Sequence, residues 1–566
     1  MVGDPTEFVI VSLTGGIAHP PGYPLLSILG RAFGALPLDP APFRISLVSV
    51  VAGAAATGIV AVTAVRLGAA GLAAVSGAVA FATTPVVWRW SVVPEAFALN
   101  DLVVAAIALA LVVWHQRPAS ATPVIAGGLL GGLALANHHT AALIAPAAAV
   151  ALWQQRGALG RRPVLIALGA LAFAVGLLPY AYVFAVAAAQ PAWSWGPMTG
   201  AADLWRLVTR DAYGGAQLVS EAAVAGGDPL RRVWLLLVSY WPAGLAVMAG
   251  LAVAWERERW WLARTVPAFV LAGPAFVAYA NIDPNGPVNR VVLERFFLLP
   301  HTLTAPLVAL GLTGLAGAAA ERLRRPMTAP AVLGAAGALV LVLAVMTYPL
   351  VDRRTDRVAR GYSLDILESV EPGTILLTNG DDSSTGVAYL QLVEGTRRDV
   401  VHVAAPLLRA DWYTRQLRAR HPGLAIPFER LGMDGDLRRL VEANPDRTFA
   451  VVGGPVDDSL RESHWLYTRG LVAILRPLPA AGSVEDLARE NDRVMFRYRI
   501  PSAADVRGRP WEQAILSDYA FPAFLVGQQY DIARQYAQAR AWYARAIAID
   551  PQMQRARDAL ARLPRT

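Results

Sequence analysis

The stretch that decides the fold is residues 329–351, APAVLGAAGALVLVLAVMTYPLV. It carries no charged side chain and is long enough to cross a bilayer as a helix, which takes about 20 apolar residues. Asp352-Arg353-Arg354 follow at once, and the sequence after them has the composition of a soluble protein. The chain therefore divides near residue 351 into a membrane part and a soluble tail.

Similar apolar stretches fill the sequence before this point. Of all residues 55% are hydrophobic and 16% are charged, whereas a soluble protein carries about a quarter charged residues. We expect ten apolar spans, at 44–67, 70–88, 97–115, 122–136, 140–155, 163–188, 233–255, 262–280, 296–320 and 329–351.

Arginines mark one side of this predicted bundle. With ten spans, the four short arginine-rich connections, residues 115–117, 155–162, 256–259 and 321–325, all fall on the same side. Short loops rich in arginine stay in the cytoplasm. The N-terminal segment and the soluble tail are then predicted to be extracytoplasmic, and the protein is predicted to be a multi-pass membrane protein.

Composition also excludes some classes of site. The chain has no cysteine, which excludes disulfides and thiolate metal sites. The net charge is +8, but no basic stripe alternates with aromatic residues, so no nucleic-acid partner is predicted. Membrane topology accounts for the arginines.

The N-terminal segment does not have the pattern of a clean span. Residues 8–36 are apolar but are interrupted by His19-Pro20-Pro21-Gly22-Tyr23-Pro24. Prolines interrupt helices, so we expect short helices at the membrane interface. No helix precedes Asp4 to export it, and we expect that a preceding transmembrane helix is missing from this sequence.

The soluble tail is predicted to hold two parts. Strand-like runs at 374–377, 400–403 and 449–452 alternate with helical stretches, which indicates a small α/β domain over 352–510. Residues 515–566 are predicted to form a tetratricopeptide-like helical hairpin, because Gly527, Tyr530, Ala539, Tyr543, Ala546 and Pro551 have that repeat's spacing. One unit cannot form a solenoid, so we expect it to pack on its neighbour or to bind a protein partner.

Polar residues gather in the predicted extracytoplasmic connections, and each group can be interpreted without a function. Asp4 and Glu7 share a helix face and could be a base with a helper, two ligands for a divalent cation, or solvated acids. His138 and His139 are adjacent and could simply be interfacial. Trp193 and Trp195 could stack on a sugar or belong to the interfacial aromatic belt. Arg290 and Arg295 could clamp a phosphate or could pair with Glu294 and Asp283.

Several of these motifs resemble one family. Residues 3–8 and 16–25, the latter containing His19-Pro20-Pro21-Gly22-Tyr23-Pro24, are similar to a bacterial membrane family of protein O-mannosyltransferase-like enzymes with the glycosyltransferase C-type fold. The resemblance covers roughly residues 3–415 and continues through 94–100, 136–140, 193–196, 213–214, 295–300, 391–400 and 412–413. The family usually has Asp-Ser-Gly-Glu where this chain has Asp4-Pro5-Thr6-Glu7, so both acids are kept.

The resemblance implies an inverting glycosyltransferase with a C-type fold over residues 1–351. The sugar, mannose at the level of the family, would pass from a polyprenyl-phosphate donor in the bilayer to a hydroxyl of a protein or glycan acceptor. Asp4 would be the base, and Glu7 would assist it or bind a divalent metal with it. The expected substrate-binding residues are His19, Tyr23, Glu95, Asn100, Asn137, His138, Trp195, Arg290 and Arg295.

Two other functions remain open from the sequence. A lipid-linked glycan transporter would need internal repeats and polar residues within the spans, and the spans are mostly Ala, Leu and Val. A non-catalytic membrane scaffold would act through the C-terminal part. The sequence does not identify the sugar, the acceptor or the metal requirement.

Overall fold

The computed structural model describes residues 3–215, 228–325, 327–432, 435–453, 458–479 and 482–564. They form two compact units. The membrane unit contains residues 11–194 and 198–354, and the soluble unit contains residues 1–10, 195–197 and 355–566.

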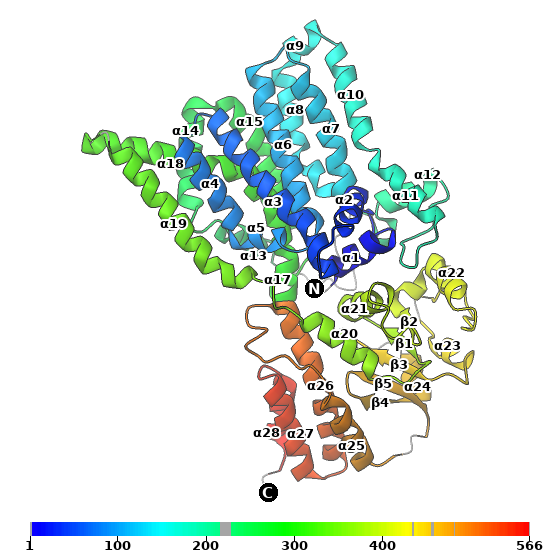
Figure 1. The fold of residues 1–566 in the computed structure, drawn as a ribbon. Coiled ribbons are helices and arrows are strands. Elements are labelled where there is room, and N and C mark those ends of the chain that lie inside the picture. The colour runs from blue at the N-terminus through cyan, green and yellow to red at the C-terminus, as the bar shows by residue number, and fades with distance from the viewer. Residues whose placement is uncertain are drawn as a thin grey trace. The chain divides into compact units, whose positions relative to one another are not determined.

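The membrane unit is built from helices (Figure 1). Its helices are the end of α1 (Asp4–Thr14), then α2 (Pro24–Gly34), α3 (Ala41–Arg66), α4 (Gly71–Thr83), α5 (Pro85–Ser91), α6 (Ala96–Gln116), α7 (Thr122–Asn137), α8 (Ala145–Gln154), α9 (Arg156–Arg161), α10 (Val164–Gly176), α11 (Pro179–Ala188), α12 (Ala201–Val208), α13 (Pro229–Val238), α14 (Gly244–Arg257), α15 (Arg259–Val270), α16 (Phe276–Tyr279), α17 (Pro287–Glu294), α18 (Leu298–Leu323) and α19 (Thr328–Val351). Short 3-10 turns, η1 (His139–Ile144), η2 (Asp211–Tyr213) and η5 (Arg295–Phe297), and a π-helical turn, η4 (Leu271–Ala275), join some of them.

The predicted span count of ten is not confirmed. Six helices in the described residues are long and apolar enough to cross a membrane, and a seventh would be the pair α4–α5, which bends by 69°. The predicted span 233–255 is interrupted between α13 and α14, where Trp241-Pro242 lies and proline cannot continue a helix. The predicted span 140–155 is a 3-10 turn followed by a helix of 10 residues.

Small residues and lipid-facing residues explain how these helices pack. A Cβ built on Gly132 of α7 would lie 2.2 Å from the Phe173 carbonyl oxygen of α10, and one built on Gly311 of α18 would lie 1.9 Å from the Ala246 carbonyl oxygen of α14. Such close approach is how membrane helices gain contact without a hydrophobic driving force. Apolar side chains that a soluble protein would bury, such as Leu341, are exposed, as lipid-facing positions are.

The N-terminal segment consists of short helices, as predicted. Helices α1 and α2 each have 11 residues and are separated by residues 15–23, which contain the Pro-Pro-Gly motif. Tyr23, the residue before α2, has a left-handed backbone with φ of 44°. Its side chain is nevertheless buried, so the turn points this phenol into the unit.

The soluble unit contains a five-stranded sheet in the order β2-β1-β3-β5-β4. Its strands are β1 (Ile375–Thr378), β2 (Val401–Ala404), β3 (Phe449–Val452), β4 (His464–Arg469) and β5 (Val472–Pro477). The three predicted strand runs are confirmed as the parallel strands β2, β1 and β3, whose continuous apolar sequence suits burial on both faces. The antiparallel hairpin β4–β5 extends this sheet.

Helices surround the sheet and continue beyond it. They are α20 (Val358–Glu368), α21 (Asp381–Leu392), α22 (Asp411–Arg420), α23 (Arg438–Glu442), α24 (Asp458–Ser463), α25 (Val484–Met495), α26 (Pro510–Ile532), α27 (Tyr536–Ile549) and α28 (Gln554–Arg562), with a 3-10 turn η6 (Ala405–Arg409).

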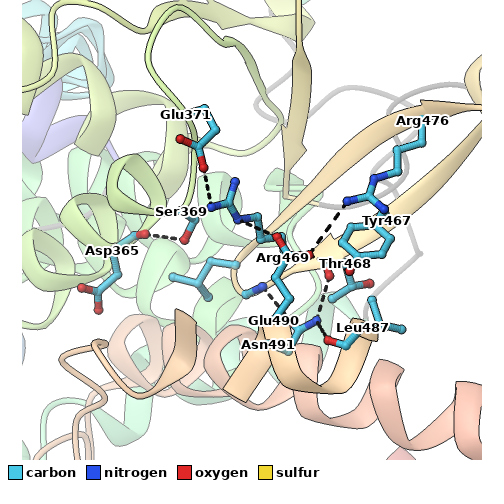
Figure 2. A network of polar contacts seen from close by, with 12 residues as sticks. Asp365, Ser369, Glu371, Tyr467, Thr468, Arg469, Arg476, Leu487, Glu490 and Asn491 are labelled. Carbon is cyan, nitrogen blue, oxygen red and sulfur yellow. Dashed lines mark hydrogen bonds and ion pairs between the residues drawn. The ribbon is translucent and has the colours of Figure 1, made fainter. Parts of the chain in front are cut away.

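A network of polar contacts ties the β4–β5 hairpin to α25 and to the end of α20 (Figure 2). The Asn491 amide of α25 donates to the carbonyls of Thr468 and Leu487 and accepts from the Gly470 N–H. Arg469 donates to Glu371 at 2.6 Å. Since Asn491 is fully buried, its amide replaces water for these backbone groups.

The C-terminal helices α26 and α27 form the predicted helical hairpin. A Cβ at Gly527 of α26 would lie 2.6 Å from the Tyr543 ring of α27, and Ala539 and Ala546 are fully buried. The positions of the repeat pattern are therefore the positions where the two helices touch. The hairpin falls in the same compact unit as the sheet, and its status as a separate tetratricopeptide-like domain stays a prediction.

Candidate active site

The N-terminal end of α6 carries a buried carboxylate. Glu95 precedes α6, is 2% exposed, and its side chain accepts from the Ala96 N–H. Its backbone is held by Ser49 of α3, whose hydroxyl donates to the Glu95 carbonyl at 3.1 Å. Arg295 lies opposite, with its Nη1 3.9 Å from the Glu95 carboxylate. The membrane unit thus pairs two of the predicted site residues.

Two aromatic rings hold the Arg295 guanidinium. Its Cζ lies 5.6 Å from the centre of the Phe97 ring and 5.7 Å from that of Phe296. Cation–π contacts of this kind fix a guanidinium while leaving its N–H groups for other acceptors. Arg295 is therefore held between two aromatic rings and beside the Glu95 carboxylate.

Histidine and tyrosine from separate segments meet beside these rings. The His138 ring lies 4.8 Å from Phe97 and 5.7 Å from Tyr23, and Tyr23 lies 5.0 Å from His19. The Thr140 N–H donates to His138 Nδ1, so the proton of a neutral ring sits on Nε2. Burial, followed by nearby cations, lowers the pKa of His138, which favours the neutral ring.

Two buried amides complete this group. Asn137 Nδ2 donates to the Ala96 carbonyl at 2.9 Å, and Asn100 Nδ2 donates to Thr140 Oγ1 at 3.5 Å. The Oδ1 atoms of both side chains are buried and have no partner among the described residues. Buried amide oxygens without donors are expected to meet a hydroxyl of water or substrate.

A pocket lies beside Asn100, Arg295 and the Phe97 and Phe296 rings. Its polar lining is Asn100, Asp101, Thr140 and Arg295, and its apolar lining includes Phe97 and Phe296. Asp101 is 2% exposed, and the Thr302 side chain of α18 interacts with its carboxyl group. Asp101 was not among the residues predicted from the sequence, although a carboxylate inside an apolar span is itself a signal of function.

Arg290 does not point to this pocket. Its Nε contacts Glu294 at 3.2 Å, and Glu294 also accepts from Arg89 at 2.8 Å. The contact observed for Arg290 is therefore the ion pair with Glu294, which was one of the two alternatives from the sequence. Its role in substrate binding stays a prediction.

The soluble unit holds the two N-terminal acids. Asp4 and Glu7 lie in the first turn of α1. Glu7 is 4% exposed, and the indole Nε1 of Trp195 donates to its Oε1 at 2.6 Å. The Trp195 ring in turn contacts the Trp412 ring of α22 at 5.5 Å. Trp195 thus orients a carboxylate. This contact belongs to neither role predicted from the sequence, which were stacking on a sugar and a place in the interfacial aromatic belt.

Asp4 and Glu7 are the part of this arrangement that could hold a metal ion. Asp4 and Glu7 supply carboxylate oxygens of the kind that divalent cations bind. No group of three or more His, Asp or Glu side chains with metal-binding geometry occurs among the described residues. Further ligands would have to come from substrate phosphate or water.

Comparisons with known proteins show which family the chain is similar to. The model of the "Protein O-mannosyl-transferase TMEM260 N-terminal domain" matches residues 4–158, and that of the "TMEM260-associated domain 2" matches residues 359–429. Both matched models describe domains of protein O-mannosyltransferase-like proteins. The family resemblance predicted from the sequence is confirmed.

Relatives and solved structures extend this finding. The chain is 27% identical over 449 residues to protein O-mannosyl-transferase TMEM260 of Mus musculus, a match that covers 76% of this chain and 63% of the relative. It is 22% identical over 528 residues to the Dictyostelium discoideum protein, covering 84% of this chain and 64% of the relative. The match therefore spans less than two thirds of the length of either relative.

The fold is similar to that of ArnT from Cupriavidus metallidurans. The ArnT structure bound to undecaprenyl phosphate matches with a TM-score of 0.55 at 14% identity, covering 85% of this chain and 95% of ArnT. The ArnT structure in the apo state matches with a TM-score of 0.55 at 13% identity, covering 84% of this chain and 93% of ArnT. The predicted glycosyltransferase C-type fold is confirmed.

Proposed function

We propose that the chain is a membrane glycosyltransferase that moves a sugar from a polyprenyl-phosphate donor to an acceptor hydroxyl on the extracytoplasmic side of a bacterial inner membrane. The observation that carries the proposal is the buried polar pocket of Asn100, Asp101, Thr140 and Arg295 within apolar helices. Polar groups at membrane depth are costly and mark function. The names of the relatives favour mannose as the sugar and a protein as the acceptor.

The proposed reaction uses a carboxylate base with a helper for the acceptor and an anion site for the leaving phosphate. The acceptor oxygen attacks the anomeric carbon, and the bond from this carbon to the phosphate oxygen breaks with its electron pair on the phosphate. Attack from the opposite side inverts the anomeric configuration. Asp4 takes the acceptor proton, and Glu7, oriented by Trp195, assists it or shares a divalent cation with it.

The leaving phosphate gains negative charge and needs donors already in place. Arg295 serves this role, because the Phe97 and Phe296 rings hold it. His138, neutral with its proton on Nε2, is a further donor, and His19 and Tyr23 support its ring. The buried side-chain oxygens of Glu95, Asn100 and Asn137 accept hydrogen bonds from hydroxyl groups of the sugar.

The test is transfer by the purified chain, in nanodiscs, from a labelled polyprenyl-phosphate mannose to acceptor peptides containing Ser and Thr. Asp4→Asn keeps the size of the side chain but removes the base, and we expect transfer to fall by about 100-fold or more. Asp39→Asn is the matched control, because the Asp39 side chain is 94% exposed. Equal transfer by Asp4→Asn and Asp39→Asn would refute Asp4 as the base, and no transfer by the wild-type chain from any polyprenyl-phosphate sugar would refute the function.

A further inference from the structure

A second buried polar group lies at the other end of the membrane unit. Arg264, in the second turn of α15, donates to the Leu111 carbonyl near the end of α6 at 2.7 Å. Leu111 is 11 residues from Asn100 on the same helix, which is about 16 Å along its axis. The arginine-rich connections 115–117, 155–162 and 256–259 follow or precede the helices that meet here.

The Arg264 side chain is enclosed by protein. It is 1% exposed, its Nε donates to Gln154 Oε1 at 2.6 Å, and its Cζ lies 4.8 Å from the Trp260 ring. The Trp260 ring stacks on His115 at 3.7 Å. Three helices, α6, α8 and α15, therefore fix the guanidinium in one orientation.

One arm of this guanidinium has no acceptor. Arg264 Nη2 is buried and has no hydrogen-bond partner among the described residues. The ion pairs found in the same residues include none to Arg264, and the nearby Glu258 carboxylate accepts from the Trp260 indole instead. A buried cation without a counter-charge is costly, so an anionic acceptor is expected here.

Arg264 also lines an apolar pocket. The rest of the lining includes Val104, Ile107, Ile144, Trp261 and Leu303. These side chains suit a hydrocarbon chain and leave the guanidinium as the sole charged group of the lining. The pocket is separate from the candidate active site, since the two share no lining residue.

We propose that this pocket binds an anionic phospholipid from the leaflet that faces the arginine-rich connections. A phosphate oxygen accepts from Arg264 Nη2, and hydrocarbon lies against Ile107, Ile144 and Leu303. Free phosphate offers the same acceptor oxygen but has no hydrocarbon chain to pack against the apolar lining of the pocket. Arginines in the neighbouring connections attract the same lipids by charge. This inference does not depend on the proposed function.

The experiment uses the full chain in detergent, with lipid binding followed by native mass spectrometry and by the thermal midpoint. Phosphatidylglycerol, phosphatidylcholine and inorganic phosphate are added separately. We expect phosphatidylglycerol to bind about tenfold or more tighter than phosphatidylcholine, as a hydrogen bond to a charged group implies. Arg264→Gln should lose this preference. Arg206→Gln, which changes a 60% exposed arginine that pairs with Asp203 and lies outside the arginine-rich connections, should keep it.

A second variant guards against a folding defect. Ala108→Leu fills the pocket from α6 but leaves Arg264 and its hydrogen-bond partners in place, and it should also lose the preference for phosphatidylglycerol. The proposal is overturned if either Arg264→Gln or Ala108→Leu binds phosphatidylglycerol as the wild type does. A thermal shift of equal size with inorganic phosphate alone would overturn the assignment to a lipid.

Discussion

The indole Nε1 of Trp195 lies 2.6 Å from Oε1 of Glu7 and donates a hydrogen bond to it. Both residues belong to the soluble unit, and the Trp195 ring packs on Trp412, which lies in α22 of that unit. A residue of the loop between α11 and α12 and a helix of the soluble tail together therefore hold one member of the acidic pair. This relationship gives the tail a role in positioning the proposed catalytic carboxylates.

Trp195→Phe tests this role. The variant keeps an aromatic ring against Trp412 but removes the N–H that orients Glu7, and a hydrogen bond to a charged group contributes about 1.5–3 kcal/mol. We expect kcat for sugar transfer to fall by about 10- to 100-fold while the donor KM changes little. Trp205→Phe, at a position 69% exposed, should leave kcat unchanged. An unchanged kcat in Trp195→Phe would show that the indole does not position Glu7 for reaction.

Arg295 should be needed as an arginine. Arg295→Lys keeps the charge but loses the planar group that Phe97 and Phe296 hold and that can meet a phosphate with two N–H groups. We expect kcat/KM to fall by about tenfold in Arg295→Lys and by more in Arg295→Gln. Arg290→Gln is the comparison, because the Arg290 guanidinium is 54% exposed and pairs with Glu294. Equal losses in Arg290→Gln and Arg295→Gln would contradict the assignment of the phosphate to Arg295.

Gly16 should not accept a side chain. A Cβ at this position would lie 1.9 Å from the Trp193 carbonyl oxygen, so the segment before α2 and the Trp193-Ser194 segment would have to separate. Overpacking of this kind costs about 1–3 kcal/mol, and we expect Gly16→Ala to lower the thermal midpoint in detergent. Gly58→Ala, where a Cβ would meet nothing within 4 Å, is the matched control. Equal midpoints for the two variants would contradict this packing.

A carboxyl in the soluble unit should make stability depend on pH. Burial, and then the nearby Asp382, raises the pKa of Asp518 from 3.8 to about 7, while Tyr362 donates a hydrogen bond to it at 3.0 Å. Between these values the folded chain keeps a proton that the unfolded chain has released. Raising the pH through this range therefore lowers the stability of the folded state.

Asp518→Asn removes this contribution. The thermal midpoint of the full chain, followed between about pH 4 and pH 7, should fall less with rising pH in the variant than in the wild type. Asp558→Asn, which changes an exposed carboxyl, should follow the wild type. The same pH slope in Asp518→Asn and wild type would show that Asp518 titrates normally in the folded protein.

Patterns read along the sequence predicted several elements of the fold correctly, although the count of ten spans is not confirmed. Apolar runs such as 329–351 gave α19, and the β-branched and apolar runs at 374–377, 400–403 and 449–452 gave the three parallel strands. The hairpin β4–β5 was missed because His464–Arg469 mixes charged, polar and aromatic residues. Its faces are set by Asn491 and Glu490 of α25, which no local pattern reveals.

Part of the candidate site was also predicted from local patterns in the sequence, and part of it was not. Glu95, His138 and Arg295 stood out as polar residues at the ends of apolar spans, and the structure brings them together around Phe97. The Trp195–Glu7 contact joins residues 188 positions apart, and composition cannot predict such a pair. Arg264 was not singled out for another reason, since the predicted topology already explains an arginine near a connection that is predicted to be cytoplasmic.

The most direct test of the proposed function is a single-turnover measurement on the wild-type chain in nanodiscs. It follows the label leaving polyprenyl-phosphate mannose and the label arriving at the acceptor peptide. A transferase joins both events in one reaction, so we expect one labelled sugar on the acceptor for each polyprenyl phosphate released. Release without labelled acceptor, or movement of the intact donor across the bilayer without release, would contradict the assignment.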